Sequence, residues 1–247
     1  MSLKIFTAVL LFLAFAGRAD NIAGVAFAAK APVMDGNASD AAWKNLAWRT
    51  FENLEFKTCS DGIKIFFLVR FKTPAPLDEH RRWNWDKKSG IYVPGNELET
   101  TLNLVIAPHA KTSLFADLWV WRAGRTNPMA SADDLYISYD SEKSVPQVFP
   151  DKGQSAWYSR YFSDYAGDII KRFYLRTPSG SAADVSAKGS WKDSEWTIEF
   201  SRKLDTGNID DLRITASEPF LCSFVVGPEL PAKPSFITLQ VEKGPEK

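Results

Sequence analysis

Cysteine and histidine are scarce in this sequence, which has two residues of each type among 247. There is no C-x-x-C pair, so cysteine-rich zinc sites and covalent attachment of a c-type haem are excluded. His80 and His109 are the only imidazole side chains. A three-histidine metal centre of the carbonic anhydrase kind is therefore excluded as well.

The sequence also lacks the short motifs of hydrolase and nucleotide sites. G-x-S-x-G, the Walker loop, the dinucleotide-binding glycine pattern and H-E-x-x-H are all missing. Asp133-Asp134 and Asp210-Asp211 are adjacent carboxylates, and neighbours on a strand point to opposite faces instead of forming an acid/base pair. Lys plus Arg equals Asp plus Glu at 30 each, so no net charge favours nucleic acid. We expect neither a nucleic-acid partner nor a catalytic site within this chain.

One long apolar run is present, "IFTAVLLFLAFAG", which follows Lys4. Spanning a bilayer takes about 20 apolar residues, so this run fits the hydrophobic part of a signal peptide better than a membrane helix. Small residues place the cleavage site near residue 19 or residue 28. We expect a signal peptide over residues 1–28, export to the periplasm, and one mature domain over residues 29–247 with no membrane span.

An exported chain meets an oxidising compartment, which favours a disulfide between Cys59 and Cys222 over two free thiols. A bridge closing so long a loop would stabilise the fold by roughly 4–5 kcal/mol in the chain-entropy treatment.

Alternating apolar residues dominate the rest of the chain. They occur in "IKIFFLVRF" (residues 63–71), "TLNLVIA" (101–107), "EWTIEFS" (195–201) and "FITLQV" (236–241), each separated from the next by turn residues. A short helix is expected after Ser39 or Asp40, with Trp43 and Leu46 on one face. The pattern predicts an all-β fold, a two-sheet antiparallel β-sandwich with short helices. Residues 150–190 are less regular and are expected to form one long excursion across the sandwich face.

The densest stretch is "DLWVWRAGRTNPMASADD", residues 117–134. Trp119 and Trp121 share one face of a predicted strand whose other face is also apolar, so the strand is either buried on both sides or lines a pocket. Arg122 and Arg125 follow and need carboxylate partners. Asp133 and Asp134 are the nearest ones, and the carboxylate of a ligand is the alternative.

This stretch resembles the D-x-W-x-W-[KR]-A-x-R-T-N-P motif of the ethylbenzene dehydrogenase-related haem-binding domain. Four further segments are similar to that family in order: "VMDGNASDAAWKNL", "GIKIFFLVRFKTPAP", "NWDKKSGIYVPGNELETTLNLVIAP" and "WKDSEWTIEFSRKLDTGNIDDL". The family includes γ subunits of periplasmic molybdenum enzymes. The resemblance implies one non-covalent b-type haem, used for electron transfer alongside a catalytic subunit or another redox partner.

The resemblance also implies haem contacts. Trp119 and Trp121 would form part of the apolar wall, and Arg122 or Arg125 would meet the haem propionates. The family's axial lysine corresponds to Lys233 in "LPAKPSFITLQV". Its axial methionine has no counterpart here, because the connection "APHAKTSLFADLW" offers His109 instead. Met129 in the turn "TNPMAS" is another candidate ligand, and Met34 is the least favoured.

Two other functions remain open. Family 9 carbohydrate-binding modules share the sandwich fold and the opening motif, and Trp83, Trp85, Trp157 or Tyr158 could stack on sugar rings. A family member that has lost its haem and serves as an interaction domain is the other alternative.

Overall fold

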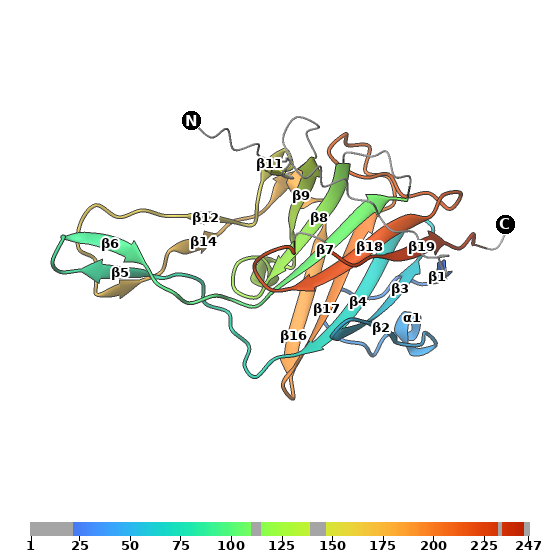
Figure 1. The fold of residues 1–247 in the computed structure, drawn as a ribbon, viewed down its shortest axis with the longest axis horizontal. Coiled ribbons are helices and arrows are strands. Elements are labelled where there is room, and N and C mark those ends of the chain that lie inside the picture. The colour runs from blue at the N-terminus through green and yellow to red at the C-terminus, as the bar shows by residue number, and fades with distance from the viewer. Residues whose placement is uncertain (1–21, 110–114, 139–146, 232–233, 245–247) are drawn as a thin grey trace, which may run out of the picture.

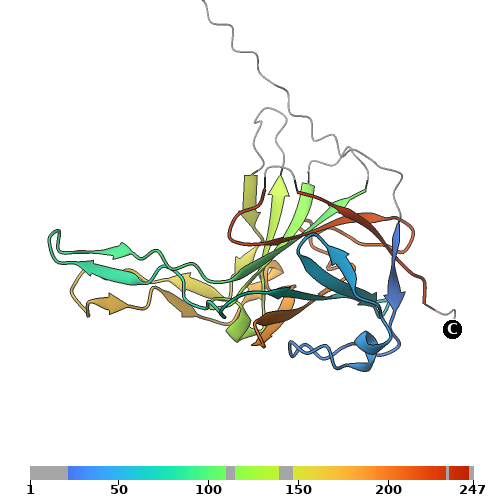
Figure 2. The same cartoon turned by 60° about the horizontal axis from the view of Figure 1, so that its bottom comes forward.

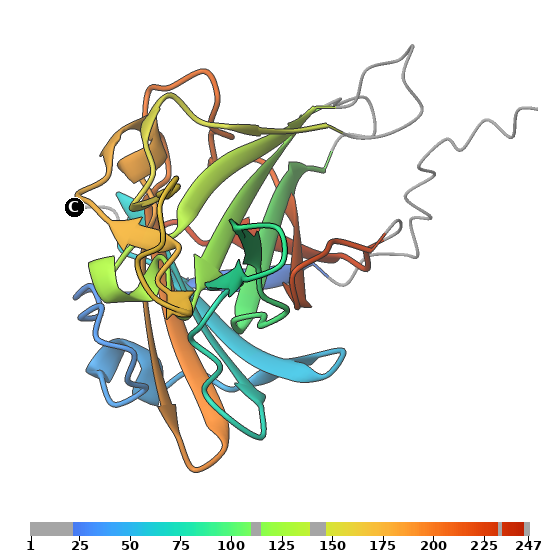
Figure 3. The ribbon, with the colours of Figure 1, turned by 90° about the vertical axis from the view of Figure 1, so that its left-hand side faces the viewer.

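The computed structural model describes residues 22–109, 115–138, 147–231 and 234–244. Its strands form one continuous path that folds into two packed layers (Figures 1 and 3). The first sheet contains β10 (Gln147–Pro150), β9 (Asp133–Ser138), β8 (Phe115–Arg122), β7 (Thr101–Pro108), β18 (Phe220–Val226) and β19 (Ile237–Val241), in that order. The second sheet contains β2 (Arg49–Phe51), β3 (Leu54–Ser60), β4 (Lys64–Lys72), β17 (Glu195–Lys203) and β16 (Ser186–Lys192). The predicted all-β sandwich is confirmed.

Strand β1 (Ala23–Phe27) joins the two sheets. Its first half pairs in parallel with β19, and its second half pairs in parallel with β3. The other named pairs within the two sheets are antiparallel. Val25 is fully buried in the core, so the described fold begins upstream of the expected boundary at residue 29. The expected cleavage positions near residues 19 and 28 stay predictions, and the second lies directly after a strand that connects both layers.

The main core lies between the sheets and contains the residues whose alternation predicted the strands. Ile65, Phe67, Val69 and Phe71 of β4 point inward, as do Leu102, Leu104 and Ile106 of β7 and Trp196, Ile198 and Phe200 of β17. Ile63 was expected in the same row, but it precedes β4 and is 68% exposed. The inward rows bury large aliphatic and aromatic side chains, and this burial is the main contribution to the stability of the fold.

The outer face of the second sheet has a cover of its own. The short helix α1 (Ala41–Lys44) follows Asp40, as predicted, and places Trp43 over Cys59, Phe66 and Leu68. The buried carboxylate of Glu199 accepts a hydrogen bond from the Trp43 indole at 2.8 Å and others from the backbone amides of Asp35 and Gly36. Glu199 of β17 thus holds both α1 and the turn at Asp35 and Gly36, and Lys57 and Ser190 add hydrogen bonds to the Trp43 and Gly36 carbonyls.

The expected disulfide is wrong, because both cysteines are free and buried. Cys59 lies under α1 on the outer face of the second sheet, whereas Cys222 points from β18 into the main core. The two thiols thus belong to different apolar clusters. Burial raises the pKa of Cys59 to about 12 and that of Cys222 well above its usual range, so neither is a reactive thiolate.

Residues 150–190 were predicted to cross the sandwich face, and this prediction is wrong. The middle of this region instead projects away from the body of the sandwich (Figures 1 and 2). The projection, called the arm below, consists of residues 83–94 and 157–175. It contains β5 (Trp83–Asp86), β6 (Ile91–Pro94), β12 (Trp157–Ser159), β13 (Ile169–Ile170) and β14 (Phe173–Leu175). Strand β13 pairs with β5, so two segments far apart in the sequence build one arm.

Short elements close the end of the sandwich near the arm. They are η1 (Asn127–Met129), β11 (Gly153–Gln154), β15 (Ser179–Gly180) and η2 (Ser181–Ala183).

Candidate functional site

Strand β8 is apolar on both faces, and the two faces belong to different clusters. Trp119 and Trp121 are fully buried and point into the main core, where they contact Phe67, Phe200 and Trp196. These contacts close the space around both indoles. The two tryptophans predicted as a haem wall therefore lie inside the sandwich.

The opposite face of β8 carries a second apolar cluster, called the outer cluster below. Its buried members come from β7, β8, β9 and β18 and are Val105, Ala107, Ala116, Leu118, Val120, Ile137 and Leu221. Leu230 and Phe236, from the connection between β18 and β19, pack against it. A sheet face of this size would be a site of association if it were left bare, and here chain from that connection covers part of it.

A cavity of about 520 Å³ adjoins the outer cluster on β18. It is lined by Glu52, Asn53, Ser223, Val225, Val226, Pro231 and Ser235. The Ser223 hydroxyl is buried there, and no hydrogen-bond partner for it exists among the described residues. Four of the seven lining residues are polar, so this cavity is not an apolar small-molecule pocket.

The predicted haem-ligand candidates lie in different places. His109 follows Pro108 at the end of β7 and is only two residues beyond Ala107 of the outer cluster. Met129 lies in η1 beyond Arg122, which pairs with Thr101 at the other end of β7. Seven residues of strand, roughly 24 Å, separate these two ends, so His109 and Met129 cannot bind one iron.

Lys233 lies outside the described residues, but Leu230 and Phe236 on either side of it both reach the outer cluster. Met34 packs under α1 on the far face of the sandwich. The two flanks of Lys233 thus pack on the outer cluster and His109 follows the end of one of its strands, whereas Met129 and Met34 lie elsewhere.

The two arginines have protein partners. The Arg122 guanidinium donates to Asp133 at 2.6 Å. Arg125 instead pairs with Glu99, which also accepts hydrogen bonds from the Gly124 and Arg125 amides at 2.7 and 3.1 Å. The prediction that Asp133 partners an arginine is confirmed for Arg122, whereas Asp134 pairs with neither arginine. Both guanidiniums are committed to carboxylates of the chain.

Arg125 also connects the arm to the sandwich. Its guanidinium lies over the rings of Trp157 and Phe173, at 4.5 and 4.7 Å from their centroids. His80 packs against Phe173 nearby. Burial and the surrounding arginines lower the pKa of His80 to about 4, so the 3.9 Å approach to Glu99 is not an ion pair at neutral pH.

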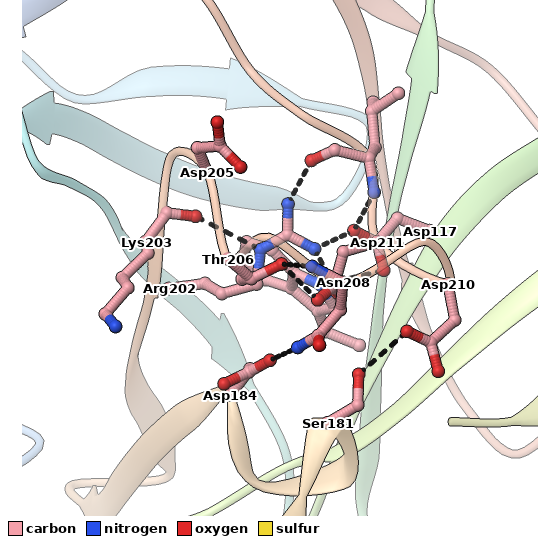
Figure 4. A network of polar contacts seen from close by, with 12 residues as sticks. Asp117, Ser181, Asp184, Arg202, Lys203, Asp205, Thr206, Asn208, Asp210 and Asp211 are labelled. Carbon is pink, nitrogen blue, oxygen red and sulfur yellow. Dashed lines mark hydrogen bonds and ion pairs between the residues drawn. The ribbon is translucent and has the colours of Figure 1, made fainter. Parts of the chain in front are cut away.

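Asp134 belongs to a buried acidic group at one end of the core that the sequence did not indicate. It shares the inward face of the first sheet with Asp117, and Asp151, Asp210 and Asp211 approach from two loops. Among the described residues, Arg202 of β17 is the guanidinium that contacts this group, and it donates to Asp117 and Asp211 (Figure 4). The "RKLDTGNIDD" segment could have suggested a link between Arg202 and Asp211, but nothing local indicated Asp117 or Asp151.

Burial sets the protonation of this group. It raises the pKa of Asp134 well above its usual range and that of Asp151 to about 8, and the neighbouring carboxylates add to both effects. Burial also disfavours the Arg202 cation, but Asp117 and Asp211 outweigh that effect and raise its pKa.

The tryptophans predicted to stack on sugars are mostly occupied. Trp83 is 6% exposed, donates to the Arg160 carbonyl at 2.7 Å and is covered by the Arg172 guanidinium, so it presents no free face for stacking on a sugar ring. The Trp157 indole donates to Asp133 at 2.8 Å. Trp85 packs edge-on against Tyr92 and Tyr165. Among the four candidates, Tyr158 is the exposed ring, at 42%.

Within the described residues, no helix has the length and apolar character needed to cross a membrane.

The family model described as ethylbenzene dehydrogenase matches residues 48–226. A family 9 carbohydrate-binding module from Caldicellulosiruptor kristjanssonii, solved with glucose, superposes with a TM-score of 0.42 at 11% identity, covering 91% of this chain and 97% of that one. A putative carbohydrate-binding protein from Bacteroides uniformis gives 0.41 at 8% identity, covering 90% and 97%. No curated protein matches the chain.

Proposed function

Since the chain belongs to the ethylbenzene dehydrogenase family, we propose that it is an exported, b-type haem-binding domain that transfers electrons for a periplasmic redox enzyme. The observation that carries this proposal is the outer cluster. It is an apolar sheet face with His109 at one edge and the flanks of Lys233 packed against it. A flat apolar wall between two nitrogen donors fits the needs of a non-covalent haem.

The residues present fit a haem on this face better than inside the sandwich. Leu118, Val120 and Val105 would form the wall, in place of Trp119 and Trp121, which fill the core; all three are 2–3% exposed, so the haem would have to lie between this face and the chain around Leu230 and Phe236 that packs on it. His109 and Lys233 are the residues that we propose would hold the haem iron. A bound haem would supply one-electron transfer, and the surrounding apolar side chains would exclude water and thereby influence its potential.

Lys233 can bind iron only as the neutral amine, so burial at the apolar face and the iron itself would have to lower its pKa. Arg122 and Arg125 are paired with Asp133 and Glu99. These ion pairs leave neither guanidinium free to meet the haem propionates. Their role in the proposal is to hold the turn after β8 and the base of the arm.

The arm is the surface that we propose for the catalytic partner. Ile91, Tyr161, Tyr165 and Ile169 are each more than half exposed there, on a projection that adds nothing to the main core. Exposed apolar side chains gathered on one element mark a contact site for protein or ligand. Two exposed tyrosines are also compatible with sugar stacking, which keeps the carbohydrate alternative testable.

Haem reconstitution of the purified mature protein tests the proposal. We expect a Soret band with one haem per chain. His109→Ala and Lys233→Ala should each shift or abolish that band, whereas the matched variant Met129→Ala should leave it unchanged. Absence of haem uptake by the wild-type protein would overturn the proposal.

A double variant, Ile91→Ser with Tyr161→Ser, tests binding of the partner protein independently of haem binding. It should keep the Soret band but no longer co-purify from the native host with a larger redox subunit. Binding to a glycan array that is lost with Tyr161 would favour the carbohydrate-binding function instead.

A further inference from the structure

Three buried carboxylates meet at one end of the sandwich. Asp151 follows β10, while Asp210 and Asp211 lie in the loop after β17. One oxygen from each lies within 4.8 Å of the others. Their exposed fractions are 4%, 8% and 9%, so these acidic groups are covered by the fold and are not a solvated surface patch.

Asp151 has nothing to offset its charge. Neither of its carboxylate oxygens has a hydrogen-bond partner among the residues that the structure describes, and the same holds for Asp134. The backbone amide of Asp151 donates to the Asp134 carbonyl at 3.2 Å, so the two residues are held next to each other. Burial of an ionised carboxylate without a partner is strongly unfavourable.

The other two members already have some support. Asp210 accepts hydrogen bonds from the Lys152 amide at 3.1 Å and from the Ser181 hydroxyl at 2.9 Å. Asp211 accepts from Thr206 at 2.6 Å and from Arg202 at 2.8 Å (Figure 4). These contacts fix the carboxylates in position and still leave lone pairs free on their oxygens.

When they are ionised, the carboxylates in this region outnumber the buried cations of the described chain. Five buried carboxylates gather there, namely Asp117, Asp134, Asp151, Asp210 and Asp211. Arg202 is the one buried cation of the described chain that contacts the group. It donates hydrogen bonds to Asp117, to Asp211 and to the Leu212 carbonyl. A second cation would neutralise the carboxylates that Arg202 does not reach.

We propose that Asp151, Asp210 and Asp211 bind a calcium ion, with Asp117 and Asp134 behind them adding to the negative potential. The donor set consists of oxygen alone, which hard cations prefer and which gives no advantage to zinc or copper. Ca²⁺ accepts irregular, crowded carboxylate sets, whereas Mg²⁺ demands near-octahedral geometry and retains its waters. Oxygens brought to within 4.8 Å of one another suit two ligands on a single calcium ion, since each Ca–O bond is about 2.3–2.6 Å long.

The ion would be structural. Asp151 continues from the edge strand of the first sheet, and Asp210 and Asp211 continue from a strand of the second, so the ion would link the two layers. The Ser181 hydroxyl bonded to Asp210 would bring η2 into the same link. The site is distinct from the outer cluster, because it lies on the inward side of β8, and the proposal does not depend on haem binding.

Calcium titration of the chelator-treated wild-type protein is the primary test. Calorimetry should give one ion per chain, and a calcium concentration a hundredfold above Kd should raise Tm by roughly 5–10 °C. Tb³⁺ should replace the ion and show luminescence sensitised by the nearby Trp119, which bonds to Asp117. Absence of calcium binding by the wild-type protein would overturn the proposal.

Variants locate the site. Asp151→Asn and Asp210→Asn should each weaken calcium binding at least a hundredfold. Asp205→Asn is the matched control, because Asp205 lies in the same loop but is exposed and paired with Arg213; its Kd should equal that of the wild type. Wild-type affinity in Asp151→Asn would mean that Asp151 is simply a protonated acid, and would overturn the assignment. If one variant does not fold, the other variant and the wild-type titration decide the question.

Discussion

At the scale of single residues, Arg202 supplies the positive charge that stabilises the buried carboxylates at the acidic end of the core. It is 1% exposed, lies 5.0 Å from the Trp119 ring centroid, and contacts two buried carboxylates. Loss of one partner of a buried ion pair leaves the remaining charges uncompensated, and this usually costs more than the pair itself contributes.

We therefore expect Arg202→Met to lower the free energy of unfolding by about 3–5 kcal/mol. The loss should be larger at pH 8 than at pH 5, because burial raises the pKa of Asp117 to about 6 and this carboxylate takes up a proton at the lower pH. Urea unfolding at the two pH values measures it. Arg213→Met is the matched control: its pair with Asp205 is exposed, and such pairs contribute about 0–1 kcal/mol. Equal stability of the two variants would contradict the prediction.

At the scale of elements, the arm depends on a small number of contacts at its base. Glu99 is 3% exposed and fixes Arg125, and Arg125 in turn lies over Trp157 and Phe173 of the arm. Trp157 is held from the other side by Asp133. The arm itself contributes no member of the main core, so this base determines its position.

Glu99→Gln should loosen the arm and leave the sandwich folded. The buried Arg125 would lose its counter-charge, at a cost of about 3 kcal/mol, which a domain with an ordinary stability of 5–15 kcal/mol survives. Limited proteolysis should then cut residues 83–94 and 157–175 faster than in the wild type. Glu55→Gln, which breaks the half-exposed pair with Arg70, serves as the control. Unchanged cleavage of the arm would show that Glu99 does not hold it.

At the scale of the whole molecule, the buried acids make stability depend on pH in a characteristic direction. The pKa of Asp151 is raised from about 3.8 to about 8 by burial, then by Asp117 and Asp210. A group whose folded-state pKa is raised stabilises the fold below its unfolded pKa, and this contribution is lost as pH rises through the folded value. His80 acts in the opposite direction, since its lowered pKa of about 4 costs stability as pH falls from 6.5.

Below pH 6.5 the buried carboxylates and His80 change the free energy of unfolding in opposite directions as the pH changes. Above pH 6.5 only the carboxylates contribute to the change. The chelator-treated protein should therefore lose about 1–2 kcal/mol of stability between pH 6.5 and pH 8. Thermal unfolding across this range measures the loss. Asp151→Asn should flatten the curve, because the amide does not titrate. A rise in stability over the same range would contradict the shifted pKa of Asp151.

Calcium should also remove this slope in the wild type, because the ion competes with protons for Asp151. The pH profile of the metal-free protein stands without the calcium proposal, so the two can fail separately.

The sequence by itself determined the sandwich and most of its core. Period-two alternation is a local property, and it correctly placed the inward rows of β4, β7 and β17 as well as the helix at Trp43. It also identified β8 as apolar on both faces. The pattern did not show which face of β8 points into the main core and which carries the outer cluster, because both faces have large apolar side chains.

The tertiary structure decided the contacts between residues that are distant in sequence. The pairing of Arg125 with Glu99, the separation of Cys59 from Cys222, and the arm built by 83–94 with 157–175 all depend on how strands register and where loops return. The same holds for the candidate sites. Sheet register places His109 and Met129 at opposite ends of β7, and two loops bring Asp151 to Asp210 and Asp211. A local sequence pattern does not encode contacts of this kind, because they form between residues that are far apart in the sequence.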